Sequence, residues 1–306
     1  MKAIHKLKVL LMPMAVIVSL SLAFVVVTGL PGQAVAGGDA RSVVVMDAAQ
    51  HVGISAQEDG IIIDHTAVDA DVIPQVWLDE ARVLDTFFTH KSIGNNILAG
   101  VAALETGDPG RYSINVAYGT GSGSGITHYQ VGSNQDPQSK IDGFEGLIRG
   151  GPVRDAAFMK FCVSDLPPWA SASPEAVWAS YRDMMAGLQA DYADTVFVWW
   201  TAPLTTASDD RGNAEKVVYN GLVRSYVEEN GGVLFDIADI ESHDPSGNAV
   251  VGPTGQEAMY DGYSDDGAHL NEVGSQRVAR GMWWLLARIA GWPGPTHKTY
   301  LPVLLK

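Results

Sequence analysis

Short apolar runs alternate with longer segments of helical periodicity along this chain, and this alternation constrains its fold more than any other feature. Strand candidates occupy residues 86–89, 112–118, 156–163, 195–201 and 233–238. Helical spacing of apolar residues follows these runs at about 97–104, 137–148, 174–188, 214–230 and 272–290. Strands separated by helices form a parallel sheet with helices on both faces. We therefore expect an α/β fold with three layers, α/β/α, whose sheet has five mostly parallel strands.

Three helix boundaries carry local signals. Asp136 before Pro137, and Ser173 before Pro174, combine a preferred N-cap residue with proline at the first helical position. Glycines at 231–232 follow the helical segment that begins near residue 214, where a left-handed C-terminal residue is common. These signals predict helix starts at 137 and 174 and a helix end at 230.

The amino-acid composition argues against a nucleic-acid partner and against disulfide bonds within the chain. The chain has 306 residues, enough for one α/β domain, and its 35 acidic residues outnumber 20 basic ones, for a net charge of −15. Phosphate contacts need clustered Lys and Arg, so we expect no nucleic-acid partner. The single cysteine, Cys162, can form no internal disulfide, and its apolar neighbours predict a small buried side chain rather than a nucleophile.

The N-terminal segment has the pattern of a bacterial signal peptide. Three lysines lie among the first eight residues, an apolar run covers 9–30, and residues 34–36 read Ala-Val-Ala, the small-x-small spacing of a cleavage site. The run could span a membrane if it were not cleaved. We therefore expect a secreted or extracytoplasmic protein that contacts a membrane only if this segment is retained.

Ser92 lies between the first main strand and the first main helix, in the segment His90-Lys91-Ser92-Ile93-Gly94. A serine at such a turn is exposed, and the helix N-terminus favours a developing negative charge. The same position also suits a helix N-cap, for which serine is a preferred residue. The local sequence leaves both a nucleophile and a cap open.

Asp266 and His269 lie in the loop before the last helix. An Asp three residues before a His, with Gly267 between them, can turn its carboxylate onto the imidazole and fix its tautomer, which is what a base for serine needs. A solvated acidic loop is one alternative. A metal site is another, because Asp261 and Asp265 lie nearby, although the group matches no defensible ligand spacing.

An early serine after the first strand, alternating strand and helix units, and a late Asp-x-x-His together resemble the SGNH (GDSL-like) hydrolase family. The resemblance covers about residues 72–291 and is strongest at Asp266 and His269. Val72-Ile73-Pro74 with Trp77, leading into the serine segment, is similar to a divergent bacterial branch. The resemblance implies a flavodoxin-like topology, no metal, no organic cofactor, and a catalytic triad of Ser92, His269 and Asp266.

The family also binds the oxyanion of the reaction with a glycine after the second strand and an asparagine after the third. Gly132 is the better candidate for the glycine, with Gly119 as the other. Ser164 stands where the family has its asparagine. Either the Ser164 hydroxyl or the Asn134 amide would then supply the side-chain donor.

With this resemblance the chain divides into four expected segments. These are a signal peptide at 1–36, an N-terminal leader at 37–71, the SGNH hydrolase-like domain at 72–291 and a C-terminal tail at 292–306. The leader holds two β-like runs, at 42–46 and 61–63. The tail is apolar and could add a strand or contact a partner.

Two further motifs indicate other folds or ligands, but they match their patterns less well. His90-x-Ser92-x-Gly94 is one substitution from the Gly-x-Ser-x-Gly turn of α/β-hydrolases, but that fold separates its acid from its histidine in the sequence. The glycines of 119–125 lack the register of a phosphate loop, which favours a flexible turn.

We therefore expect a secreted serine hydrolase that cleaves a carboxylic ester through an acyl-enzyme. Its substrate would be a small-molecule or carbohydrate ester. The alternative is an SGNH-like binding or surface protein whose catalysis has decayed.

Overall fold

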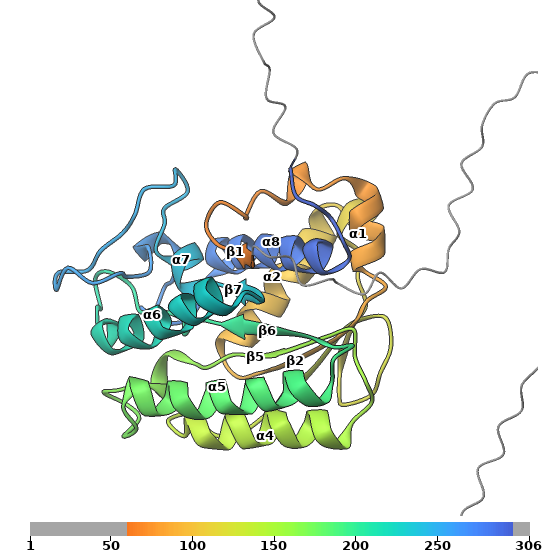
Figure 1. Ribbon diagram of the computed structural model, residues 1–306. Helices are drawn as coiled ribbons and strands as arrows, with labels where there is room; N and C mark the ends of the chain where they lie inside the picture. Colours follow the sequence, from red (N-terminus) through yellow and green to blue (C-terminus); the bar gives the residue numbers. More distant parts are fainter. Residues whose placement is uncertain (1–59, 296–306) are drawn as a thin grey trace, which may run out of the picture. The chain divides into compact units, whose positions relative to one another are not determined.

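The computed structural model describes residues 60–295, which form a seven-stranded parallel sheet between two layers of helices (Figure 1). The strands are β1 (Ile61–Ile63), β2 (Asp85–His90), β3 (Val116–Tyr118), β4 (Gly125–Gln130), β5 (Ala156–Met159), β6 (Val196–Trp200) and β7 (Val233–Phe235). The helices are α1 (Gln75–Ala81), α2 (Ile93–Gly107), α3 (Pro109–Tyr112), α4 (Pro137–Gly150), α5 (Pro174–Asp191), α6 (Asn213–Asn230), α7 (Ile237–Glu241) and α8 (Glu272–Ile289). Single 3-10 turns occupy η1 (Ala70–Val72), η2 (Val163–Asp165) and η3 (Asp261–Tyr263).

The three-layer parallel arrangement confirms the predicted fold class. The strand order is β1-β7-β6-β5-β2-β4-β3, so the five inner strands run β7-β6-β5-β2-β4 and follow the doubly wound, flavodoxin-like order. The chain reverses its direction of winding at β2, which pairs with β4 on one side and with β5 on the other. Ligands of such folds bind outside the carboxyl ends of the strands at this switch point, where the loops after β2, β4 and β5 meet.

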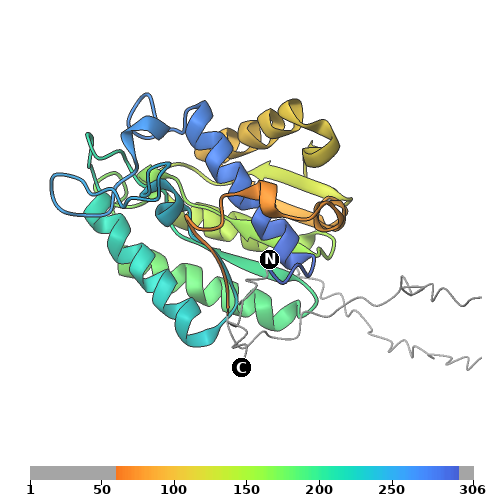
Figure 2. The same ribbon diagram turned by 90° about the horizontal axis from the view of Figure 1, so that it is seen from above.

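Each face of the sheet has its own core. Neighbouring strand residues point to opposite faces, so Phe87 and Trp199 pack into one cluster while Phe88 and Trp200 pack into the other. Helices α4, α5 and α6 cover the first face, and α1, α2 and α8 cover the second (Figure 1, Figure 2). Helices α2 and α8 pack side by side, which matters because α2 begins directly after Ser92 and α8 begins three residues after His269.

The predicted number of strands was wrong, because the sheet has seven strands rather than five. The second inner strand is β4, at 125–130, whereas the sequence favoured 112–118. Strand β4 escaped detection because its residues are Gly-Ile-Thr-His-Tyr-Gln, and its last three side chains are partly or fully exposed. It lies next to the edge strand β3 and therefore does not need to be apolar throughout.

The remaining strand of the sheet, β1, comes from residues that the sequence assigned to the N-terminal leader. It pairs in parallel with β7 at the other edge of the sheet. The expected signal peptide at 1–36 and the β-like run at 42–46 lie outside the described residues, and so does most of the tail. Within residues 60–295 no helix is both long and apolar enough to cross a membrane.

The helix boundaries agree with their local signals. The Asp136 side chain accepts a hydrogen bond from the backbone N–H of Ser139 and caps α4, and the Ser173 side chain caps α5 in the same way. Helix α6 ends at Asn230, and its C-cap residue is Gly231, whose φ of +73° suits glycine. These residues therefore mark the starts of α4 and α5 and the end of α6.

Candidate active site

Ser92 occupies a sharp turn between β2 and α2. Its φ of +50° and ψ of −106° are unusual for a residue with a side chain, and such strain tends to occur at functional positions. Two residues later, a Cβ on Gly94 would lie 2.3 Å from the ring of His90, so the turn requires glycine there. The Ser92 side chain makes no capping hydrogen bond to α2. Its hydroxyl is therefore free of the structural role that the sequence left open.

Asp266 and His269 are joined within one short loop. The Asp266 Oδ2 atom lies 2.7 Å from His269 Nδ1, and Oδ1 accepts hydrogen bonds from the backbone N–H groups of His269 and Ala268 at 2.7 and 2.9 Å. Gly267 has a φ of +86°, which lets the chain fold the carboxylate back onto the ring. Partial burial alone would raise the pKa of Asp266, but these hydrogen bonds outweigh it and hold the pKa well below its usual range.

His269 connects the loop to the serine. Its Nε2 atom is hydrogen-bonded to Ser92 Oγ, although the two residues are 177 positions apart. When Nδ1–H donates to Asp266, Nε2 is left as the acceptor for the serine hydroxyl. The structure thus brings together the three side chains predicted from the sequence, in the order carboxylate, imidazole, hydroxyl. A series of hydrogen bonds from carboxylate to imidazole to hydroxyl can activate the hydroxyl for nucleophilic attack.

The site is open to solvent. The side chains of His269 and Asp266 are 49% and 56% exposed, so a large molecule can reach them. By contrast, His90 is buried against His128, with 3.0 Å between their ring nitrogens. Burial, with a smaller contribution from Lys160, lowers the pKa of His90 to about 3. His90 therefore stays neutral and enclosed, and His269 is the histidine available to a substrate.

The backbone supplies donors at the same edge of the sheet. Gly132 is the second residue after β4 and has a φ of +64°, and a Cβ there would lie 2.6 Å from Cγ of Lys140. Among the described residues, the backbone N–H groups of Ser92 and Gly132 have no hydrogen-bond acceptor. Both N–H groups come from the loops that follow the neighbouring strands β2 and β4.

The two candidate side-chain donors differ in their surroundings. Asn134 is exposed, and its Oδ1 atom accepts a hydrogen bond of 3.0 Å from Lys140 Nζ. Ser164 is half-buried in η2, in the segment that follows β5, and its hydroxyl has no hydrogen-bond partner within residues 60–295. Gly119, the other glycine candidate, lies between β3 and β4 rather than after the inner strand. Gly132, and not Gly119, therefore occupies the position after the inner strand β4.

A buried ion pair that the sequence analysis missed ties these loops together. Asp165 is fully buried, and its carboxylate binds Lys140 Nζ at 2.5 Å, the backbone N–H of Cys162 at 2.6 Å and that of Gln135 at 3.0 Å. It thereby connects the loop after β4 to the loop after β5. The sequence did contain a signal for this ion pair. Lys140 lies next to Ile141 on the apolar stripe of α4, and burying a lysine there without an acidic partner would cost free energy of folding.

Cys162 is buried, as predicted, and it also contacts the serine turn. Its thiol donates a hydrogen bond to the backbone carbonyl of Lys91 at 3.3 Å.

Asp261 and Asp265 are the other two carboxylates of the metal site that the sequence left open. They are hydrogen-bonded to different partners. Asp261 accepts from the backbone N–H of Ser208 at 3.0 Å, and Asp265 accepts from the Asn271 amide at 3.1 Å. Both carboxylates therefore already serve to hold loops in place.

Comparisons with known proteins identify no family. No family model matches the sequence, and a search of curated proteins finds no significant match. Similar solved structures include a GDSL-like lipase from Bacteroides thetaiotaomicron, with 10% identity over 73% of this chain and 94% of that one and a TM-score of 0.46. An acetylxylan esterase from Geobacillus stearothermophilus has 12% identity over 68% and 94% of the two chains, with a TM-score of 0.44. An acetyl xylan esterase named AlAXEase has 16% identity over 65% and 97%, also with a TM-score of 0.44. Likeness at this level does not assign a family or an activity to the chain.

Proposed function

We propose that this protein is a serine hydrolase that cleaves carboxylic esters through Ser92, His269 and Asp266. The observation that carries this proposal is the unbroken hydrogen-bond chain from Asp266 through His269 to Ser92. The strained backbone of Ser92 and the absence of a capping bond from its side chain support the same role. A residue used only as a helix cap would direct its oxygen to the backbone N–H groups of α2.

The proposed reaction has two halves. Ser92 Oγ attacks the ester carbonyl carbon while His269 Nε2 takes the hydroxyl proton, and Asp266 stabilises the imidazolium that forms. The tetrahedral intermediate collapses to an acyl-enzyme, and His269 gives the proton to the departing alcohol. Water, activated by His269 in the same way, then releases the carboxylic acid and restores Ser92.

We further propose that the oxyanion is bound by the free backbone N–H groups of Ser92 and Gly132, together with the Ser164 hydroxyl. Ser164 is preferred to Asn134 because it is half-buried and its hydroxyl has no partner within residues 60–295, whereas Asn134 is exposed. Lys140 binds only the Asn134 amide oxygen, so the Asn134 NH2 group is the competing donor. The Asp165 ion pair would position both loops without touching the substrate.

Two features of the chain bear on the substrate class. The expected signal peptide favours action outside the cytoplasm, and the exposed triad admits an ester on a polymer as readily as a small one. An acylated carbohydrate is therefore the favoured substrate. A catalytically decayed binding protein remains the second candidate, because Ser164 replaces the asparagine of the family that the sequence resembles.

A panel of esters tests this proposal. We expect the purified protein to hydrolyse short-chain nitrophenyl esters and acetylated sugars, with heat-unfolded protein as the background control. The reason is that the proposed nucleophile, base and oxyanion donors need no added cofactor. Product release is followed by absorbance and by acid titration. Saturable binding of an acetylated sugar without hydrolysis of any ester would favour the decayed protein instead.

Variants of the two polar loop residues test the oxyanion site. Ser164→Ala should lower turnover ~100- to 1000-fold, the usual effect of losing one oxyanion donor, whereas Asn134→Ala should have little effect. Ser164→Asn should retain or raise activity, because an amide can donate from the same position. Thermal melts of the three variants control for folding. The assignment fails if Asn134→Ala is the damaging change or if neither alanine variant loses activity.

A further inference from the structure

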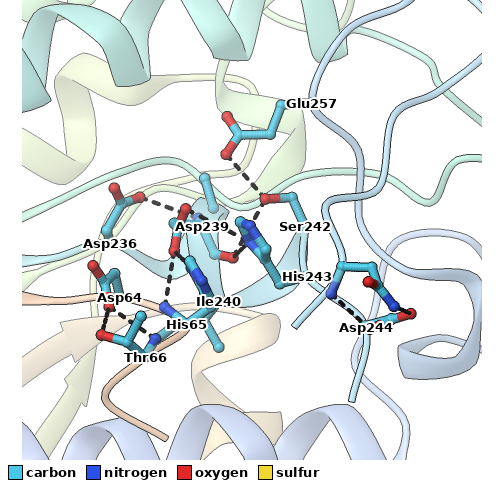
Figure 3. Close-up of polar contacts among 12 residues, drawn as sticks. Asp64, His65, Thr66, Asp236, Asp239, Ile240, Ser242, His243, Asp244 and Glu257 are labelled. Atoms are coloured by element: carbon cyan, nitrogen blue, oxygen red, sulfur yellow. Dashed lines mark hydrogen bonds and ion pairs between the residues drawn. The ribbon is translucent and has the colours of Figure 1, made fainter. Parts of the chain in front are cut away.

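A second polar cluster lies at the same edge of the sheet but far from Ser92. It is formed by His65, Asp239 and His243, which gather where β1 and β7 end (Figure 3). Four strand spacings of ~4.8 Å separate β1 from β2, so the cluster lies roughly 19 Å along the sheet from the serine turn. The proposed ester hydrolysis gives no role to these three side chains.

Asp239 is at the centre of the cluster. Its Oδ2 atom lies 2.5 Å from His65 Nδ1 and also accepts the backbone N–H of His65 at 2.8 Å. The His243 Nδ1 atom lies 2.8 Å from the backbone carbonyl oxygen of Asp239. The two imidazole rings are stacked, with their centroids 3.5 Å apart. One potential ligand atom from each of the three residues lies within 4.8 Å of the others.

The surrounding contacts hold the cluster in place. The Asp236 side chain caps α7 by accepting the backbone N–H of Asp239, and it is itself paired with Arg224. The Tyr263 hydroxyl donates to the backbone carbonyl of His243 at 2.9 Å. These contacts fix the backbone from which the Asp239 and His243 side chains extend. The side chains of His65, Asp239 and His243 are 27%, 21% and 15% exposed, so an ion could enter without opening the core.

We propose that His65, Asp239 and His243 bind one divalent transition-metal ion, for which Zn²⁺ is the representative. Two imidazoles and one carboxylate suit zinc, cobalt or nickel, whereas calcium and magnesium prefer sites made wholly of oxygen. A shared ion lies in the plane of both rings, so the rings must turn out of their stack. The terminal torsion of a histidine side chain has a broad energy minimum, which permits this turn.

Such an ion would join two parts of the chain that are far apart in the sequence. His65 follows β1, an edge strand of three residues, while Asp239 and His243 belong to the segment after β7. A ligand that binds only the folded protein stabilises it by mass action. The metal would therefore anchor β1 to the sheet, and this role does not depend on the proposed esterase activity.

Metal titration of the full-length protein tests the proposal. After treatment with a chelator, calorimetry should detect one Zn²⁺ ion per chain, and Co²⁺ should give visible absorption bands of a nitrogen- and oxygen-ligated site. His65→Gln, Asp239→Asn and His243→Gln should each weaken binding by at least about 100-fold, since lost ligands cost more than lost outer contacts. Zn²⁺ should raise the melting temperature of the wild type and not of these variants.

Two control variants locate the ion. Asp244→Asn removes a neighbouring carboxylate that binds Asn248 and Ser246, and it should leave the affinity unchanged. His269→Gln removes the exposed imidazole beside Ser92, and it too should leave zinc binding intact. The proposal is wrong if the wild type binds no zinc, if the three ligand variants bind it as tightly as the wild type, if binding is lost in His269→Gln, or if calcium binds equally well.

Discussion

Replacing Ser92 by alanine is expected to lower ester turnover by roughly 10⁶-fold, the loss seen when a triad nucleophile is removed. The substitution takes away the atom that forms the acyl-enzyme, while His269 and Asp266 keep their own hydrogen bonds. Initial rates on the best ester of the panel measure the loss. The melting temperature should change little, because the Ser92 side chain makes no hydrogen bond to the backbone of α2.

A second serine-to-alanine variant, away from the site, controls for general effects of the substitution. Ser246→Ala alters an exposed serine in the loop after α7 and should keep full activity. If Ser92→Ala retains more than a few per cent of the wild-type turnover at unchanged stability, another residue is the nucleophile.

Asp266→Asn is expected to reduce turnover by about 10⁴-fold, because an amide cannot hold the histidine in the tautomer that accepts the serine proton. The hydrogen bonds that hold the pKa of Asp266 well below its usual range keep the carboxylate charged throughout the working pH range. The loss should therefore appear at every pH from 5 to 8 at which the wild type is active. Steady-state kinetics at several pH values provide the measurement.

Asp265→Asn is the matched control, because it removes the adjacent carboxylate. Asp265 faces the Asn271 amide, which lies at the N-terminus of α8, rather than the His269 ring. We expect a loss of less than tenfold, an order-of-magnitude figure for a change outside the triad. Equal losses in the two variants would mean that the wrong aspartate has been assigned to the base.

The positions of Ser92, Asp266 and His269 could be predicted from the sequence, because they depend on local spacing and on the topology of a parallel sheet. The Asp-x-x-His spacing is a local contact that a short loop can close. Ser92 lies next to that loop because the binding sites of open parallel sheets lie beyond the carboxyl ends of the strands. The three side chains are hydrogen-bonded as the resemblance implied, and their catalytic roles remain predictions.

Features that depend on distant pairing were not predictable in the same way. Strand β4 is half-polar, so its membership of the sheet depends on its neighbours β2 and β3 rather than on its own pattern. The pair of Lys140 and Asp165 joins two loops whose proximity follows only from the correct position of β4. The cluster of His65, Asp239 and His243 requires β1 to pair with β7, which no periodicity in a three-residue strand can indicate.

Covalent labelling tests the central claim most directly. A serine-directed organophosphonate should add once to the wild-type protein, and intact mass spectrometry with peptide mapping should locate the adduct on Ser92. The Ser92→Ala variant should stay unlabelled, and labelling of Asp266→Asn should be much slower because its base is poorly oriented. Labelling of a different serine, or no labelling of a folded wild-type protein, would contradict the assignment of Ser92 as the nucleophile.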